Sequence, residues 1–181
     1  MSAGQPLVSV IIATRNSAAT LARALDSVFG QSFAAREVLV IDGGSTDGTV
    51  DLLRRYAPRL AHWESEPDRG LYHAFNKAIA RAKGEWLYFL GSDDYLWDAT
   101  VLERMAPHLA RARPGHRVVY AHASFVSESG ETLELLGKPW EEYRRPFLQG
   151  FMIPHQATFQ HRTLFEVHGG FDESYRIGGD Y

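Results

Sequence analysis

Residues 7–29, LVSVIIATRNSAATLARALDSVF, carry two successive periodicities. Leu7 to Ala13 is an apolar run rich in valine and isoleucine, which is typical of a parallel strand covered on both faces. From Ser17 to Phe29 the apolar residues recur at helical spacing, and Asn16 or Ser17 is suited to cap that helix. The stretch therefore predicts a buried strand followed directly by an amphipathic helix.

The same alternation continues on the C-terminal side of this unit. Apolar runs predict further strands at residues 37–41, 60–64, 85–90 and 117–124. Apolar residues at helical spacing lie between these strands, and Pro58 and Gly84 end two of the helices. Strands that alternate with helices imply right-handed crossovers and a mostly parallel sheet. We therefore expect an α/β fold with a doubly wound, Rossmann-like sheet, formed by residues 1–181 as a single domain.

The pattern changes after Ala123. Ser129-Gly130 predicts a hairpin turn, and residues 139–154 are rich in aromatic residues and proline, which predicts a long loop. Residues 157–160 predict one more strand, so we expect a small antiparallel portion toward the C-terminal end. Residues 178–180, a glycine pair followed by an acid, are typical of the start of a helix. We therefore expect the domain to be truncated at its C-terminus.

The composition excludes several classes of protein. A hydrophobic share of 45% and a charged share of 23% are ordinary for a soluble globular domain, and the net charge of −3 argues against a nucleic-acid binder. The absence of cysteine excludes disulfides and thiolate metal sites and fits a reducing compartment. No apolar run is long enough to span a bilayer, and the first residues lack the features of a signal peptide. We expect a cytoplasmic protein.

Polar side chains follow three of the predicted strands. These are residues 14–16 after the first strand, 42–48 after the second and 91–94 after the fourth. Ligands of open α/β sheets bind beyond the carboxyl ends of the strands, so three such segments predict a binding site. The alternative is ordinary turn chemistry, because Asp, Gly, Ser and Asn are common in turns.

The adjacent acids Asp93 and Asp94 follow a buried strand at residues 86–90. Two neighbouring carboxylates repel each other unless a cation or a shared proton intervenes. Oxygen ligands suit Mg²⁺ or Mn²⁺, which usually complete their shell with waters and substrate phosphates. The pair therefore predicts a metal and a diphosphate ligand. The alternative is a solvated turn that caps the next helix.

Two other phosphate-binding motifs are absent. Gly43, Gly44 and Gly48 allow close approach of the backbone to a ligand, but they do not form the Gly-x-Gly-x-x-Gly pattern directly after a strand. The chain also lacks a Gly-Lys-Ser/Thr phosphate loop. These observations argue against a nicotinamide-dependent enzyme and a P-loop kinase.

The segments described above resemble those of the family 2 glycosyltransferases, in the same order and over nearly the whole chain. The matching stretches are residues 8–16 (VSVIIATRN), 40–49 (VIDGGSTDGT), 65–79 (SEPDRGLYHAFNKAI), 91–94 (GSDD) and 169–173 (GGFDE), together with Asp180. The resemblance implies a GT-A fold, a nucleoside-diphosphate sugar donor, Mn²⁺ or Mg²⁺, and inversion at the anomeric carbon. A glycan or lipid-linked acceptor in bacterial surface polysaccharide or lipopolysaccharide synthesis is the implied partner.

The resemblance also implies a role for individual residues. Thr14, Asn16 and Asp42 would border the nucleoside, Asp68 and Arg69 would lie near the donor, Asp93 would face the ribose or sugar, Asp94 would bind the metal, and Asp180 would be the general base. A UDP-sugar is the favoured donor, although Gly43 stands where many relatives carry an acid that contacts the base. His73 also replaces an acid that is common in close relatives.

Two other functions fit part of this pattern. A sugar nucleotidyltransferase also needs a metal and an α/β sheet, but it usually has a glycine-rich basic loop after the first strand, and residues 14–17 contain no glycine. A non-catalytic nucleotide-sugar-binding module would not need the acids at 94 and 180. The resemblance further suggests peripheral association with the cytoplasmic face of the inner membrane, through a C-terminal part beyond this chain.

Overall fold

A computed structural model describes residues 6–112, 115–127, 129–149 and 153–175 and shows a six-stranded mixed sheet. In spatial order its strands are β3 (His62–Ser65), β2 (Arg36–Asp42), β1 (Val8–Thr14), β4 (Trp86–Phe89), β8 (Thr158–His161) and β5 (Val118–Tyr120). The first four strands pair in parallel, whereas β8 runs antiparallel to both β4 and β5. The predicted mostly parallel sheet with an antiparallel portion is therefore confirmed.

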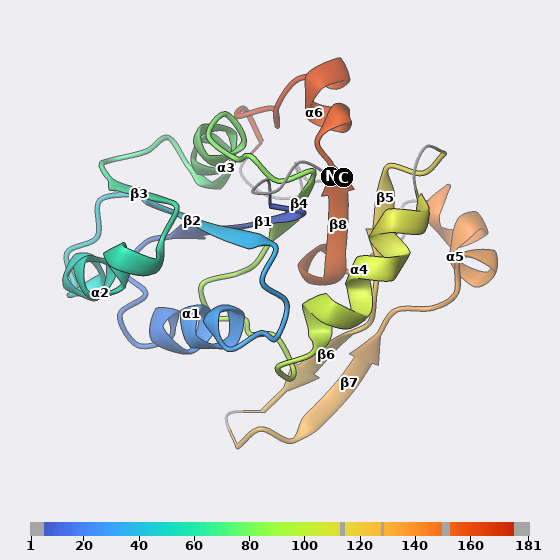
Figure 1. The fold of residues 1–181 in the computed structure, drawn as a ribbon, viewed down its shortest axis with the longest axis horizontal. Coiled ribbons are helices and arrows are strands. Elements are labelled where there is room, and N and C mark those ends of the chain that lie inside the picture. The colour runs from blue at the N-terminus through green and yellow to red at the C-terminus, as the bar shows by residue number, and fades with distance from the viewer. Residues whose placement is uncertain (1–5, 113–114, 128, 150–152, 176–181) are drawn as a thin grey trace.

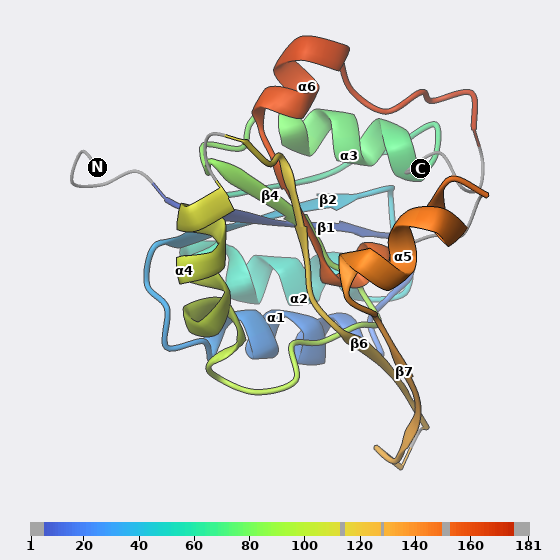
Figure 2. The ribbon, with the colours of Figure 1, turned by 90° about the vertical axis from the view of Figure 1, so that its right-hand side faces the viewer.

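Helices cover both faces of this sheet (Figure 1; Figure 2). On one face lie α1 (Leu21–Phe29), α2 (Thr49–Tyr56) and α4 (Val101–Ala112), and on the other lie α3 (Leu71–Ile79) and α6 (Thr163–His168). Alternate residues of β1 point to opposite faces, so that Val10 and Ile12 pack in the first cluster and Ile11 packs in the second. Each face has its own apolar core, which explains why β1 is apolar throughout.

A second, two-stranded sheet projects from the main body, as Figure 2 shows. It consists of β6 (Ala123–Val126) and β7 (Thr132–Leu136), an antiparallel hairpin with a bulge opposite the end of β6. Gly130 has φ +84° in the connecting turn, so the predicted hairpin turn is confirmed. The single strand predicted at 117–124 is wrong, because the chain leaves the main sheet after β5 and starts the hairpin at β6.

The long loop predicted at 139–154 is also wrong in its first half, because α5 (Trp140–Phe147) lies there. Pro139 precedes this helix, and its carbonyl accepts hydrogen bonds from the amides of Glu142 and Tyr143. Acids in the first turn and arginines in the last turn complement the helix dipole. Two short 3-10 turns, η1 (Ala57–Arg59) and η2 (His155–Ala157), complete the elements. Among the described residues, no helix is both long and apolar enough to cross a bilayer.

Candidate active site

The register of the parallel strands brings three predicted segments to one edge of the sheet. Thr14 at the end of β1 pairs with Asp42 at the end of β2, and Asp42 pairs with Ser65 at the end of β3. The amide of Gly43 continues the ladder with a 2.9 Å hydrogen bond to the carbonyl of Thr14. The loops that carry the predicted donor-binding residues therefore start side by side.

Asp42 is fully buried beneath these loops. Its carboxylate accepts hydrogen bonds from the amide and hydroxyl of Ser45 and from the hydroxyl of Ser65, at 2.9 Å for the amide and 2.6 Å for Ser65. A buried carboxylate is tolerated when it is hydrogen-bonded in this way. Asp42 thus fastens the turn after β2 to the end of β3 and forms the floor of the site.

Asn16 joins the loops after β1 and β2. Its backbone lies in the left-handed region at φ 52°, a conformation in which asparagine is favoured among non-glycine residues. Its side-chain oxygen accepts a hydrogen bond from the backbone amide of Thr46, and its backbone amide donates a 2.7 Å hydrogen bond to the hydroxyl of Ser45. Asn16 therefore shapes the backbone of the site.

Thr14 offers a polar group that the described residues leave unsatisfied. The residue is 5% exposed, and its hydroxyl oxygen is buried without a hydrogen-bond partner among the described atoms. Nearly all buried polar atoms in folded proteins have a partner, so an unpaired hydroxyl at a ligand-binding edge suggests that a ligand supplies one.

Two glycines allow the segment after β3 to approach the turn after β2. A Cβ atom on Gly43 would lie 2.6 Å from Oδ2 of Asp68, and one on Gly44 would lie 3.2 Å from the backbone nitrogen of Pro67. Gly44 also has φ +77°, which favours glycine. The carboxylate of Asp68 therefore occupies the space that a side chain at position 43 would take.

Arg69 is engaged by the C-terminal segment. Its Nε donates a 3.1 Å hydrogen bond to Glu173 although the side chain is 70% exposed. Asn76 of α3 donates from its amide nitrogen to the Phe171 carbonyl and to Glu173, and its oxygen accepts from the Phe171 amide. The hydrogen bonds from Asn76 and Arg69 hold the pKa of Glu173 below its usual range. Residues 171–173 are thus clamped beside the predicted donor site.

The acidic pair Asp93 and Asp94 stands directly after β4. A Cβ atom on Gly91 would lie 2.5 Å from Oδ2 of Asp94 and 2.9 Å from Oδ1 of Asp93, so both carboxylates approach the Gly91 backbone. Burial and the charge of Asp93 raise the pKa of Asp94. A carboxylate whose charged form is disfavoured in this way suits a hard divalent cation, which would offset the repulsion.

The described residues contain no group of three or more His, Cys, Asp or Glu side chains arranged as a ready metal cage. A cation at Asp94 would therefore need further oxygen ligands from solvent or from a bound phosphate. This arrangement is the usual one for Mg²⁺, which keeps several waters and binds substrate phosphates.

Arg23 of α1 contacts the turn that carries the acidic pair. Nothing in the sequence indicated this role, because Arg23 is only one polar residue on the exposed face of the helix. Its guanidinium donates a 3.1 Å hydrogen bond to the carbonyl of Asp93 and lies 4.4 Å from the ring centroid of Tyr95. The hydroxyls of Ser17 and Ser92 are 2.9 Å apart and join the same turn to the loop after β1. These contacts fix the turn that carries both carboxylates.

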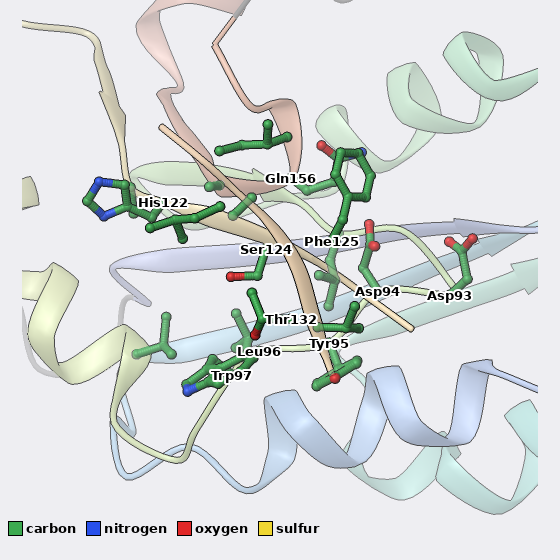
Figure 3. A pocket seen from close by; sticks show the side chains of 18 of the residues that line it. Asp93, Asp94, Tyr95, Leu96, Trp97, His122, Ser124, Phe125, Thr132 and Gln156 are labelled. Atoms are coloured by element: carbon green, nitrogen blue, oxygen red, sulfur yellow. The ribbon is translucent and has the colours of Figure 1, made fainter. Parts of the chain in front are cut away.

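A cavity of about 1030 Å³ opens beside the acidic pair and continues to the β6–β7 hairpin (Figure 3). We call it the hairpin groove. Its lining includes Asp93, Asp94, Tyr95, Leu96, Trp97, His122, Ser124, Phe125, Thr132, Leu135 and Gln156. Figure 3 shows the two carboxylates at one end of this lining and His122 and Trp97 at the other. The groove was not expected from the sequence, because it is formed by segments far apart in the chain.

His73, His155 and Gln156 have defined contacts in the structure. The ring centroid of His155 lies 5.9 Å from that of Phe89, and the carbonyl of Gln156 accepts a 2.7 Å hydrogen bond from the hydroxyl of Tyr88. Nδ1 of His73 accepts a 3.3 Å hydrogen bond from the amide of Arg69. Asp180, the predicted general base, lies outside the described residues.

Comparisons with known proteins agree with this architecture. Residues 9–167 match glycosyl transferase family 2. A PGL/p-HBAD biosynthesis glycosyltransferase of Mycobacterium bovis is 35% identical over 179 residues, which cover 97% of this chain and 67% of that protein. An uncharacterized glycosyltransferase of Mycobacterium tuberculosis is 36% identical over 177 residues, covering 97% of this chain and 66% of its own length.

Two solved structures share the fold. The mannosyltransferase PcManGT from Pyrobaculum calidifontis, in complex with GDP-Man and Mn²⁺, has a TM-score of 0.73 at 26% identity and matches 97% of this chain. S. aureus TarS 1-349 in complex with UDP-GlcNAc has a TM-score of 0.70 at 22% identity and matches 91% of this chain. The chain spans about half of each, 50% and 48% respectively. The chain therefore belongs to glycosyltransferase family 2 and has the GT-A-like α/β sheet of these structural neighbours.

Proposed function

We propose that this chain transfers a sugar from a nucleoside-diphosphate donor to a hydroxyl of a glycan or lipid-linked acceptor, with inversion at the anomeric carbon. The observation that carries the proposal is the convergence of three strand-end loops around the acidic pair, in which Asp94 is half-buried and Asp93 is exposed. The Thr14 hydroxyl, which has no hydrogen-bond partner among the described residues, and the Asp68 carboxylate face the same edge of the sheet as Asp93 and Asp94. Such an edge suits a ligand with a polar base, a ribose and phosphates.

The donor-binding roles follow from these positions. Asn16 and Asp42 hold the loops that border the nucleoside, and Thr14 and Asp68 offer it an uncommitted hydroxyl and a carboxylate. Arg69 reaches the donor diphosphate by exchanging Glu173 for a phosphate, a favourable partner for a guanidinium. The structural neighbours hold UDP-GlcNAc in one case and GDP-Man in the other, so hydrogen bonds to the base determine whether the donor carries uracil or guanine.

Asp94 is the proposed ligand of Mn²⁺ or Mg²⁺, with Asp93 beside it toward the ribose or sugar. The structural neighbour PcManGT was solved with Mn²⁺ and GDP-Man, which supports a divalent cation here. A bound cation would stabilise the negative charge on the departing nucleoside diphosphate as a Lewis acid. Arg23, by fixing the turn through the Asp93 carbonyl, keeps the two carboxylates in place.

The reaction requires a base for the acceptor hydroxyl, and Asp180 is the proposed one. The acceptor oxygen forms its bond to the anomeric carbon while the bond from that carbon to the diphosphate oxygen breaks. The hydroxyl proton passes to the carboxylate of Asp180, and general-base catalysis of this kind typically contributes about 10²–10⁴-fold. Asn76 supports this role indirectly, because it anchors residues 171–173, which lead toward position 180.

The first test is thermal unfolding with UDP, GDP and dTDP, each with and without Mn²⁺. A ligand at about 100 times its dissociation constant stabilises a protein by about 2.7 kcal/mol, which gives a clear shift. We expect one nucleotide to give a metal-dependent shift that Asp94→Asn abolishes. Asp51→Asn is the matched control, because Asp51 is an exposed helix acid whose ion pair among the described residues is with Arg54.

No metal-dependent shift with any nucleotide, in the wild-type chain and in the Asp51→Asn control alike, would contradict the proposal. Release of pyrophosphate from a nucleoside triphosphate would identify a nucleotidyltransferase instead. Donor binding without transfer or hydrolysis, unchanged by Asp94→Asn, would identify a non-catalytic module.

A further inference from the structure

The ion pair between Arg69 and Glu173 joins two segments that are held in different ways. Arg69 lies in the loop directly before α3, and its side chain is 70% exposed. Gly70, the next residue, has φ +128°, and a Cβ atom added there would meet nothing within 4 Å. The guanidinium of Arg69 therefore has room to leave its partner without disturbing the core.

Glu173, in contrast, belongs to an anchored segment. The ring of Phe171 packs against four aromatic rings of α3, β4 and α6, with centroids 5.4 to 5.7 Å apart. The amide and carbonyl of Phe171 both bond to the side chain of Asn76, which also donates to Oε1 of Glu173 at 3.1 Å. The Glu173 side chain is 29% exposed. Its carboxylate is therefore the fixed member of the pair, and Arg69 is the movable one.

The Glu173 carboxylate and a diphosphate compete for the same edge of the guanidinium. Oε2 of Glu173 accepts hydrogen bonds from both Nε and Nη2 of Arg69, at 3.1 and 2.5 Å. A guanidinium also binds a phosphate with two neighbouring N–H groups, and one edge cannot serve both partners at once. A diphosphate that takes this edge must open the ion pair, and the pair closes again when the diphosphate leaves.

We propose that Glu173 is an internal competitor for Arg69, which limits the affinity of the site for the nucleoside diphosphate and so promotes release of that product after transfer. The inference rests on the proposed function, in which Arg69 contacts the donor diphosphate. It adds the residue that regulates how tightly this site holds its product. Release of product limits the rate of many enzymes. Glu173 acts through Arg69 and is a positioning residue, without a part in the bond-making step.

The test is isothermal titration of the full chain, in the presence of Mn²⁺, with whichever of UDP, GDP and dTDP gives the largest metal-dependent unfolding shift. Glu173→Gln should bind this nucleotide about two- to fivefold more tightly than the wild type, because an exposed ion pair contributes only a modest free energy to be overcome. Glutamine keeps a side-chain oxygen for the amide of Asn76, so the segment stays anchored. Equal or weaker binding by Glu173→Gln would overturn the inference.

Asp172→Asn is the matched control. It removes the same charge at the neighbouring position, where the carboxylate bonds to the amide of Ser174, and it should leave the affinity unchanged. Arg69→Gln gives the second comparison, because it should lower the affinity by about tenfold through loss of a charge-assisted hydrogen bond. In the Arg69→Gln background, Glu173→Gln should have no effect, since the two side chains act as one pair.

A gain in affinity that persists without Arg69, or that appears equally in Asp172→Asn, would mean that only the negative charge near the diphosphate matters. Either result would overturn the inference. Circular dichroism of each variant checks that it is folded.

The same titrations separate this inference from the proposed function. Metal-dependent nucleotide binding by the wild type, without a gain in Glu173→Gln, overturns the competitor role and leaves the transferase function standing. Absence of nucleotide binding in the wild type and in Glu173→Gln alike contradicts the proposed function and overturns the inference with it. The inference is supported when Glu173→Gln binds more tightly, Asp172→Asn does not, and the gain disappears in the Arg69→Gln background.

Discussion

The sheet edge after β1, β2 and β4 and the β6–β7 hairpin are built in opposite ways. At the sheet edge, polar side chains bond to one another and to the backbone, as Asp42 does with Ser45 and Ser65. Along the hairpin, apolar side chains such as Phe125 and Leu135 are largely exposed. The side chains of the sheet edge are held by hydrogen bonds within the protein, whereas the hairpin exposes apolar surface to solvent.

This difference bears on the proposed transfer reaction. A donor made of base, ribose and diphosphate needs hydrogen-bonding groups held in fixed positions. Asp93 and Asp94 belong to both regions, and the proposed chemistry takes place at this junction.

The largest expected effect contrasts two phenylalanines. Phe89 of β4 is 1% exposed and packs against the rings of Phe75, Phe165 and Phe171, with centroids 4.6 to 6.0 Å away. Phe89→Ala should lower the free energy of unfolding by about 3–5 kcal/mol. Phe125→Ala should change it by less than about 0.5 kcal/mol, because that side chain is already exposed. Urea unfolding measures both, and similar values would mean that the hairpin belongs to the core.

The next effect concerns the junction itself. Asp94→Asn should lower donor turnover by about 10²-fold or more, because stabilisation by a divalent cation is worth several kcal/mol. Turnover with donor and Mn²⁺ measures it, with Asp51→Asn as the control. A variant that keeps normal turnover would remove Asp94 from the metal site.

The same variant should be more stable than the wild type when metal is absent at neutral pH. Burial and Asp93 raise the pKa of Asp94 in the folded state. A carboxyl group with a raised folded pKa favours the fold while it is protonated, and this contribution is lost as the pH rises through that pKa. Melting temperatures at neutral pH and near pH 3 check the sign, since the advantage of the variant should shrink in acid.

A smaller effect is expected where two loops meet in the rigid region. Gly43→Ala places a Cβ atom 2.6 Å from Oδ2 of Asp68, so the flexible carboxylate must move. Nucleotide affinity should fall by about tenfold, the equivalent of one charge-assisted hydrogen bond, with little change in stability. Gly115→Ala is the control, because its Cβ would meet nothing within 4 Å. Titration with the preferred nucleotide measures the change, and equal affinities in the two variants would exclude Asp68 from donor binding.

The smallest effect compares two exposed acids, one at the sheet edge and one in the C-terminal segment that follows α6. The carboxylate of Asp47 accepts hydrogen bonds from Thr49 and from the amide of Ala18, which hold its pKa below the usual range. Asp172 has a lowered pKa through Ser174 alone, two residues along the chain. Stability gained from such a group is present above its unfolded pKa, about pH 4, and is lost as the pH falls through its folded pKa.

Asp47→Asn should therefore lower the melting temperature slightly at neutral pH, by more than Asp172→Asn, because Asp47 joins two loops. Both differences should shrink as the pH falls below about 4. Melting temperatures across this range measure them. A larger effect of Asp172→Asn would show that the C-terminal segment is as firmly held as the sheet edge.

The strands of the main sheet could be predicted because burial on both faces leaves a local pattern. The apolar runs predicted at 37–41 and 85–90 correspond to β2 and β4. The helix α5 was missed because aromatic residues and prolines are common in loops, and the deciding contact, the Pro139 carbonyl with the amides after it, is not visible in composition. The first helix begins at Leu21, later than expected, and the amide of Ser17 before it bonds to the hydroxyl of Thr49 at the start of α2.

The sequence by itself determined the α/β class, the order of the strands along the chain and the turns that carry the polar residues, because these depend on neighbours a few residues apart. Only the tertiary structure decided which groups meet. It buried Asp42, placed Asp68 over Gly43 and paired Arg69 with Glu173. The same holds for the hairpin groove, whose lining includes residues 93–97 and residues 121–127. Such contacts depend on strand register and helix packing, in which residues distant along the chain are brought within a few ångströms of each other.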